Sequence, residues 1–130
     1  MSAHVGIVLV SHSAELAAGL CLLVRQIGSD AVPVATAGGT DDGRIGTSYD
    51  RVLSAMKDAD RGGGVLVLPD LGSSVLTART VLDDHPRPDV VIADAPFVEG
   101  AVAAAVTAAS GADLQTVLTS AEEARHVRKL

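Results

Sequence analysis

Apolar and polar positions follow two alternating periodicities along this chain, which predicts strands that are each followed by a helix. Val5–Ser11 is an almost continuous apolar run rich in β-branched residues, typical of a buried parallel strand. The segment Ala14–Ile27 then repeats apolar residues at helical spacing, and Gly28 is expected to end that helix. The face predicted to point inward consists of Leu16, Leu20, Leu23 and Ile27.

The alternation continues to the C-terminus. Further strands are expected at Val32–Ala37, Val65–Pro69 and Asp89–Ala93, with a fifth at Leu114–Leu118. Further helices are expected after Thr47 (as N-cap, with Asp50 bonding back to it), at Ser73–Leu82, at Val98–Ser110 and at Ser120–Lys129. This order predicts one α/β domain over residues 1–130. Its open, mostly parallel sheet of four or five strands has helices on both faces and the flavodoxin-like order 2-1-3-4.

Composition narrows the function classes. The chain is 48% hydrophobic but only 2% aromatic, so the core must be built from Val, Leu, Ile and Ala. A net charge of -6 argues against nucleic acid as a partner, because phosphate binding needs a basic face. No apolar stretch approaches the roughly 20 residues that span a bilayer, and the start does not resemble a secretion signal. With Cys21 as its single cysteine, the chain is expected to be cytoplasmic.

His12 and Asp70 are the candidate catalytic pair. His12 follows the first predicted strand and Asp70 follows the third. These two strands are neighbours in a flavodoxin-like sheet, and ligands bind beyond the carboxyl ends of the strands. A carboxylate that accepts a hydrogen bond from one imidazole nitrogen leaves the other nitrogen free as a nucleophile. Taken alone, Asp70 also suits a helix cap, so the pair rather than either residue favours phosphoryl transfer.

Several neighbouring residues are candidates for phosphate binding. Ser13, Ser73 and Ser74 lie at expected helix starts, where hydroxyl and backbone N–H groups can bind phosphoryl oxygens. The glycine-rich segment 38–46, with Gly38, Gly39 and Thr40, follows the second strand and is expected to shape the rim of the same crevice. Within it, Arg44 either contacts the phosphate or solvates the loop, and the second interpretation is favoured.

Other chemistries fit poorly. The glycine-rich segment lacks the Gly-Lys-Ser/Thr ending of a P-loop, and no GxGxxG follows the first strand. His4 and His12 lie roughly 26 Å apart along an extended strand and cannot share a metal ion. We therefore expect no metal and no cofactor. A response-regulator receiver would need an acidic pair after the first strand, where Ser11-His12 stands, and a lysine after the fifth, where Thr119-Ser120 stands.

The chain resembles the DhaM family, the phosphotransferase subunits of bacterial dihydroxyacetone kinase, which are related to mannose-type EIIA domains. The resemblance covers nearly the whole chain. The segments that carry it are Gly6–Ser13, Ala37–Asp41, Ile45–Ser48, Asp70–Ser73 and Ala95–Ala101. The first segment is common among α/β chains, whereas the set in this order is specific. The Gly-Gly-Thr and Gly-Thr-Ser pieces favour DhaM over sugar-specific EIIA.

This resemblance implies a phosphorelay. His12 would accept a phosphoryl group from phospho-HPr, with Asp70 as its acidic partner, and pass it to ADP held on DhaL. The resulting ATP would phosphorylate dihydroxyacetone on DhaK. The resemblance also implies a homodimer, with which the small-residue face Ala101, Val102, Ala105, Val106 and Ala109 is compatible. Two alternatives stay open: a sugar EIIA domain that passes phosphate to an EIIB, and a non-catalytic regulatory module.

Overall fold

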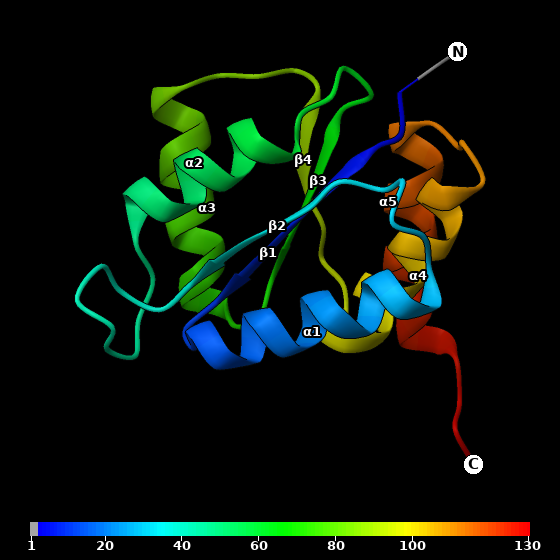
Figure 1. Cartoon of the computed structure of the whole chain (residues 1–130), viewed down its shortest axis with the longest axis horizontal. Helices are drawn as coiled ribbons and strands as arrows, with labels where there is room; N and C mark the ends of the chain where they lie inside the picture. The colour runs from blue at the N-terminus through cyan, green and yellow to red at the C-terminus, as the bar shows by residue number, and fades with distance from the viewer. Residues whose placement is uncertain (1–2) are drawn as a thin grey trace.

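The computed structural model describes residues 3–130 as a four-stranded parallel sheet between two layers of helices (Figure 1). The strands are β1 (Gly6–Ser11), β2 (Val34–Gly38), β3 (Val65–Pro69) and β4 (Val90–Ile92). Their order is β2-β1-β3-β4, which confirms the predicted topology. Ser11 pairs with Gly38 and Val10 with Pro69, so β1, β2 and β3 end at the same edge of the sheet.

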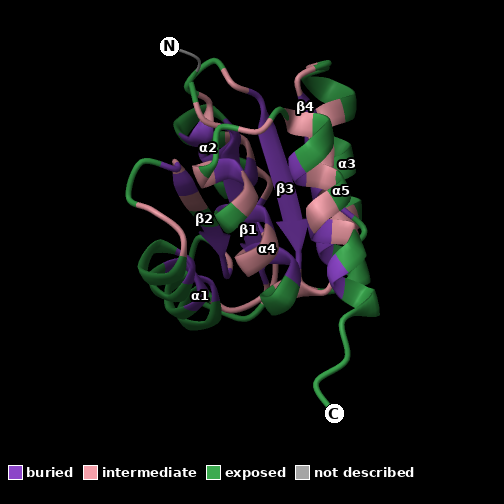
Figure 2. Ribbon diagram, turned by 90° about the vertical axis from the view of Figure 1, so that its right-hand side faces the viewer, coloured by how far each residue is buried: buried purple, intermediate pink, exposed green. Residues whose placement is uncertain are grey.

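Alternate side chains of β1 pack into the two layers. The helices are α1 (Ala14–Ile27), α2 (Tyr49–Ala59), α3 (Gly72–Asp84), α4 (Phe97–Ala109) and α5 (Leu114–Glu123), followed by a 3₁₀ turn, Ala124–His126. Ile7 and Leu9 pack with α1, α4 and α5, whereas Val8 and Val10 pack with α2 and α3. Figure 2 shows the strands buried between helices that expose their outer surfaces.

The predicted fifth strand is wrong. Leu114–Leu118 forms the beginning of α5, which is capped by the Asp113 side chain accepting the N–H of Thr116 and ends at Glu123 rather than Lys129. Val117 and Ala121 are its buried residues, one helical turn apart. A short apolar run has the same appearance in a strand and in a buried helix turn, and only packing against α4 decides between them.

The predicted inner face of α1 is also wrong, except at Leu20. Ala17, Cys21 and Val24 join Leu20 against the sheet, while the other three predicted residues, Leu16, Leu23 and Ile27, are exposed. Small side chains at the contact let α1 lie close to the strands. This rotates the leucine stripe to the side of the helix. The burial of Cys21 agrees with its expected role as a small core residue.

Two smaller details differ from the prediction. Ser48, not Thr47, is the N-cap of α2, and its hydroxyl accepts the N–H of Arg51. Thr47 instead hydrogen-bonds through its hydroxyl to Thr77 on α3 at 2.7 Å. In α4 the buried residues are small ones, and Val106 from the predicted face is exposed: the buried set is Gly100, Ala101, Ala104, Ala105 and Ala108. No helix within residues 3–130 is long and apolar enough to cross a membrane.

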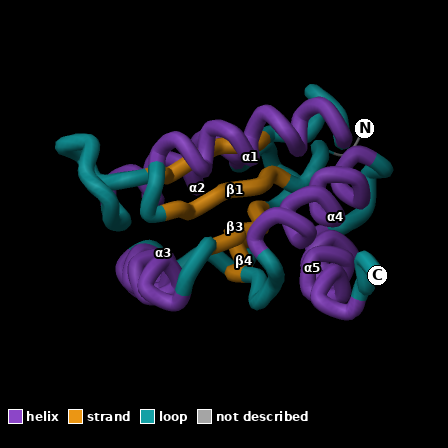
Figure 3. Tube along the Cα trace, turned by 90° about the horizontal axis from the view of Figure 1, so that it is seen from below, coloured by secondary structure: helices purple, strands orange, loops and turns teal. Residues whose placement is uncertain are grey.

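Glycine brings the end of β2 against the start of α1. A Cβ on Gly38 would lie 2.7 Å from Ala14 Cα and 2.9 Å from Ser13 O, so no side chain fits there. Gly39 follows with φ of +71°, a conformation that L side chains rarely adopt. The loop after Gly39 then extends away from the body of the molecule at this edge of the sheet (Figures 1 and 3).

Candidate active site

The ends of β1 and β3 bring the predicted catalytic pair together. His12 follows the last residue of β1, and Asp70 follows the last residue of β3. Because Val10 and Pro69 are partners in the sheet, the next residues of the two strands meet at its edge. His12 Nδ1 lies 2.9 Å from Asp70 Oδ1. The predicted meeting of these side chains is present in the structure.

Asp70 accepts four hydrogen bonds, two on each carboxylate oxygen. Oδ2 accepts the hydroxyl of Ser11 and the backbone N–H of His12, both at 3.0 Å. Oδ1 accepts the hydroxyl of Ser74 at 2.6 Å as well as the Nδ1–H of His12. Both carboxylate oxygens are therefore held in place by residues of β1, the β1–α1 connection and α3.

This hydrogen bonding determines the charge of Asp70. Burial on its own raises the pKa of the Asp70 carboxyl, since only 8% of the side chain is exposed. The hydrogen bonds from Ser74, from both N–H groups of His12 and from Ser11 together outweigh burial and hold the pKa below its ordinary value. Asp70 is consequently an anion at neutral pH, and it accepts hydrogen bonds without donating any.

An ionised Asp70 fixes the tautomer of His12. The carboxylate oxygen needs a proton from Nδ1, so in the neutral ring the lone pair is on Nε2. The hydroxyl of Ser73 lies 2.6 Å from Nε2 and donates to that lone pair. The side chain of His12 is 20% exposed, and its contact with Ser73 is on the exposed side of the site. Nε2 therefore carries the lone pair of the ring on the exposed side of the site.

The first turn of α3 lies beside Nε2 of His12, because Ser73 belongs to that turn. Its N-cap, Leu71, has no side chain that can accept an N–H, so no side-chain cap closes this helix end. The first N–H groups of a helix and the positive end of its dipole favour an anion. A Cβ added at Gly72, the first helical residue, would meet no heavy atom within 4 Å. This helix start can bind phosphoryl oxygens beside His12.

The other predicted phosphate ligands are occupied in this structure. The hydroxyl of Ser13 accepts the N–H of Leu16 and caps α1. Ser74 is fully buried and donates to Asp70, with its oxygen also 3.2 Å from His12 Nδ1. Phosphate binding by these two serines stays a prediction. Ser11, which was not among the predicted site residues, has a buried hydroxyl that donates a hydrogen bond to Asp70. The sequence feature that points to Ser11 is a polar residue at the end of an otherwise apolar strand.

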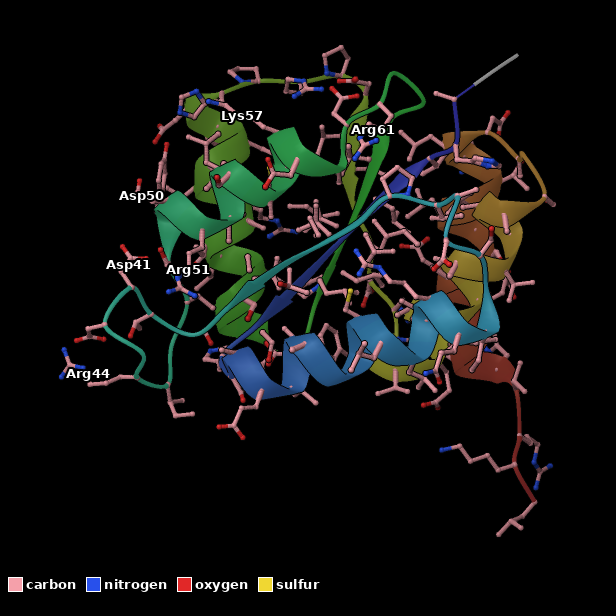
Figure 4. All side chains as sticks on the ribbon, in the orientation of Figure 1. Asp41, Arg44, Asp50, Arg51, Lys57 and Arg61 are labelled. Carbon is pink, nitrogen blue, oxygen red and sulfur yellow. The ribbon has the colours of Figure 1, made fainter. Side chains whose placement is uncertain are left out.

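The glycine-rich loop is tied to the site through its backbone. The N–H of Gly46 donates to the carbonyl of His12 at 3.0 Å. Thr40 organises the turn, since its hydroxyl accepts the N–H of Arg44 at 3.0 Å. Arg44 pairs with Asp42 at the outer tip and points away from the body, as Figure 4 shows. This geometry agrees with the loop-solvating interpretation of Arg44.

Comparison with known proteins gives the family. Residues 6–118 match the EIIA-man family model, described as the PTS system fructose IIA component. The DhaM phosphotransferase subunit of PTS-dependent dihydroxyacetone kinase from Lactococcus lactis is 33% identical over 118 residues, covering 91% of this chain and 94% of that protein. The chain belongs to the DhaM family. A phosphoryl donor subunit DhaM from Listeria innocua is 37% identical, covering 81% of this chain and 82% of the relative.

Longer DhaM proteins contain more than this domain. The Escherichia coli DhaM is 39% identical over 131 residues, which is 96% of this chain but 28% of the relative. Among solved structures, the protein of unknown function EF1359 superposes with a TM-score of 0.81 at 33% identity, covering 92% of this chain and 94% of its own. The dihydroxyacetone kinase of C. freundii shares the fold alone, with a TM-score of 0.62 at 16% identity over 94% of this chain and 25% of the kinase.

Proposed function

We propose that this DhaM-family chain is a phosphoryl carrier in which Nε2 of His12 accepts a phosphoryl group from phospho-HPr. His12 then passes the group to ADP held on DhaL, and the ATP so formed phosphorylates dihydroxyacetone on DhaK. The observation that carries this proposal is the contact between Nδ1 of His12 and Asp70 at 2.9 Å, which leaves Nε2 unprotonated at the exposed side of the ring. Both partners are macromolecules, so a reactive atom near the surface suits the task.

The two transfers are balanced without a change in protonation of His12. In the first, Nε2 forms a bond to phosphorus as the bond to the donor's imidazole breaks. The ring then carries positive charge, which the Asp70 carboxylate stabilises through the Nδ1–H. In the second, an oxygen of the ADP β-phosphate attacks phosphorus and the bonding electrons return to Nε2. Nδ1 keeps its proton throughout.

Ser73 and the start of α3 provide the groups that follow the phosphoryl group. The Ser73 hydroxyl is bonded to Nε2 in the free protein, and by rotation it can donate to a phosphoryl oxygen instead. The N–H groups of the uncapped first turn of α3 add to this stabilisation. The structure describes one protomer, and the homodimer implied by the resemblance is part of this proposal.

The decisive experiment is a reconstituted relay with Enzyme I, HPr and radiolabelled phosphoenolpyruvate. Label is expected on the wild-type chain and not on His12→Ala, and adding DhaL with bound ADP should discharge it. The description of the EIIA-man family model names a fructose system, and this supports the alternative of a sugar EIIA domain. Discharge by an EIIB domain and not by DhaL–ADP would favour that alternative. A chain that takes up no label at all would favour a regulatory module.

A further inference from the structure

Three polar side chains hold the glycine-rich loop against the start of α2. The hydroxyl of Ser48, the N-cap of α2, donates to Oδ1 of Asp41 at 2.6 Å. Nε of Arg51, in the first turn of α2, donates to the same carboxylate oxygen at 3.3 Å. We refer to Asp41, Ser48 and Arg51 as the loop clasp. Figure 4 shows Asp41 and Arg51 on the side of the loop that adjoins α2, with Arg44 at its outer end.

Arg51 also binds the end of the neighbouring strand. Its Nη1 donates to the carbonyl of Gly38, the last residue of β2, at 3.1 Å. This strand lies at the edge of the sheet, and the pairing partner of Gly38 is Ser11 of β1. A guanidinium is planar and has several donors at fixed angles, so a single side chain can bind two acceptors. Arg51 thereby joins the end of β2, the loop and α2.

Backbone hydrogen bonds carry this restraint through the loop to His12. The N–H of Thr40 donates to the carbonyl of Arg44 at 2.9 Å, which closes a turn that contains Asp41. Gly46 follows this turn, and its N–H donates to the carbonyl of His12 at 3.0 Å. A Cβ on Gly46 would lie 2.8 Å from Cγ2 of Thr40, so the two ends of the turn are packed together. Holding Asp41 in place therefore also holds the N–H that binds the carbonyl of His12.

The backbone of His12 is restrained on both sides. Its N–H donates to Oδ2 of Asp70 after β3, and its carbonyl accepts the N–H of Gly46 from the loop after β2. The imidazole meets a phosphoryl group in line only if the backbone that carries it is fixed. A misplacement on the order of 1 Å, even one caused far from the reacting atoms, can slow a reaction about 100-fold. Loss of the contact with Gly46 would leave only one of these two restraints.

The stability of the fold does not account for the pair formed by Arg51 and Asp41. Their side chains are 42% and 66% exposed, and an ion pair with such exposure contributes little to stability. Arg51 does not reach the reacting atoms either. Within the described residues 3–130, its side chain donates hydrogen bonds to Asp41 and to the carbonyl of Gly38. Any effect of Arg51 on the reaction therefore passes through the loop and the end of β2.

We propose that Arg51 is a positioning residue for phosphoryl transfer to His12. It binds Asp41 and the carbonyl of Gly38, and so keeps the glycine-rich loop in place. The loop in turn restrains the backbone of the reacting histidine through the N–H of Gly46. This inference rests on the proposed function and adds to it a residue of α2 that acts without touching the phosphoryl group.

The test measures phosphorylation of Arg51→Gln by a protein donor and by a small one. Phosphoramidate is the small donor, since it transfers its phosphoryl group to an imidazole without docking. We expect kcat with phospho-HPr to fall about tenfold while KM stays within about twofold of wild type, and labelling by phosphoramidate to slow as well. Hydrogen exchange at the amide of Gly46 should be about tenfold faster in the variant, because the loop is less restrained.

Arg25→Gln is the matched control. Arg25 on α1 donates to the carbonyl of Val34 at 3.3 Å, at the opposite end of β2, and so makes the same kind of bond away from the loop. This variant should keep the wild-type rates and the wild-type exchange at Gly46. Asp41→Ala breaks the loop clasp from the other side. It should reproduce the loss seen in Arg51→Gln, and the double variant should lose no more than either single variant.

The outcomes separate this inference from the proposed function. A loss of kcat together with faster exchange at Gly46 supports the role of Arg51. Wild-type kcat in Arg51→Gln, a loss without faster exchange, or a change confined to KM for phospho-HPr would overturn it while leaving His12 as the carrier. An equal loss in Arg25→Gln, or losses that multiply in the double variant, would overturn it too. If Arg51→Gln does not fold, Asp41→Ala decides by the same criteria. A wild-type chain that neither donor labels at His12 would overturn the proposed function itself.

Discussion

Replacing Asp70 by Asn changes almost no volume but should reverse the tautomer of His12. The backbone N–H of His12 can only donate, so the new amide oxygen must take the place of Oδ2, where that N–H bonds at 3.0 Å. The amide nitrogen then takes the place of Oδ1, 2.9 Å from Nδ1, and donates to it. Nδ1 becomes the acceptor, and the proton moves to Nε2, the atom that has to attack phosphorus.

The size of this effect follows from the bonds that are changed. A hydrogen bond to a charged group is worth about 1.5–3 kcal/mol, which corresponds to roughly 10- to 150-fold in rate. Holding the imidazole in the unreactive tautomer takes the loss further: the same Asp→Asn change in the serine protease triad costs about 10⁴-fold. We expect Asp70→Asn to phosphorylate about 10³-fold more slowly than wild type, within that range.

The assay is the initial rate of His12 phosphorylation by phospho-HPr and, separately, by phosphoramidate. Both rates should fall, because the defect lies in the nucleophile and not in docking. Asp113→Asn is the matched control, because it makes the same Asp-to-Asn change at the N-cap of α5, away from His12. Circular dichroism and thermal melting establish that the variants are folded. Rates for Asp70→Asn within threefold of wild type would refute the proposed control of the tautomer by Asp70.

Three further predictions concern Ser73, the acid stability and Gly38. Ser73→Ala removes the 2.6 Å contact with Nε2, and single-turnover labelling should show a roughly tenfold slower transfer with unchanged melting; unaltered transfer would exclude Ser73 from the reaction. The pKa of Asp70 is lower in the folded protein than the roughly 3.9 of an unfolded chain. The contribution of ionised Asp70 to the free energy of unfolding is therefore fully present above about pH 4, and it is lost as the pH falls through the folded-state pKa. Urea unfolding should therefore show the stability gap between wild type and Asp70→Asn shrinking below pH 4, and a constant gap would contradict this. Gly38→Ala should lower the free energy of unfolding by about 1–3 kcal/mol, because its Cβ would lie 2.7 Å from Ala14 Cα, whereas Gly72→Ala should not; equal stability of the two would contradict the packing at Gly38.

The topology and the contact between His12 and Asp70 could be predicted because both follow from the order of the elements. Once β1 and β3 are neighbours, any residues that directly follow them meet at one edge, and His12 and Asp70 do so. Ser11 escaped prediction because its side chain was assigned to the strand, although a hydroxyl at the end of a buried strand needs a partner. The roles of Ser13 and Ser74 depend on rotamers, which spacing does not determine.

The elements that were predicted wrongly depend on packing between layers. Leu114–Leu118 suits a strand as well as a helix turn, and its place against α4 makes it a helix. On α1, helical spacing predicted Leu16 to point inward, but the small residues Ala17 and Cys21 face the sheet instead. Leu16 is exposed as a result. A preference for large apolar residues in the core therefore predicted the wrong inner face of α1.

The most direct test of the account is the position of the phosphoryl group on the imidazole of His12. The chain, labelled with ¹⁵N at histidine and phosphorylated by Enzyme I, HPr and phosphoenolpyruvate, can be examined by long-range ¹H–¹⁵N NMR. We predict phosphorus on Nε2 and a protonated Nδ1 still bonded to Asp70. Phosphorylation at Nδ1, or at any residue other than His12, would contradict the central claim.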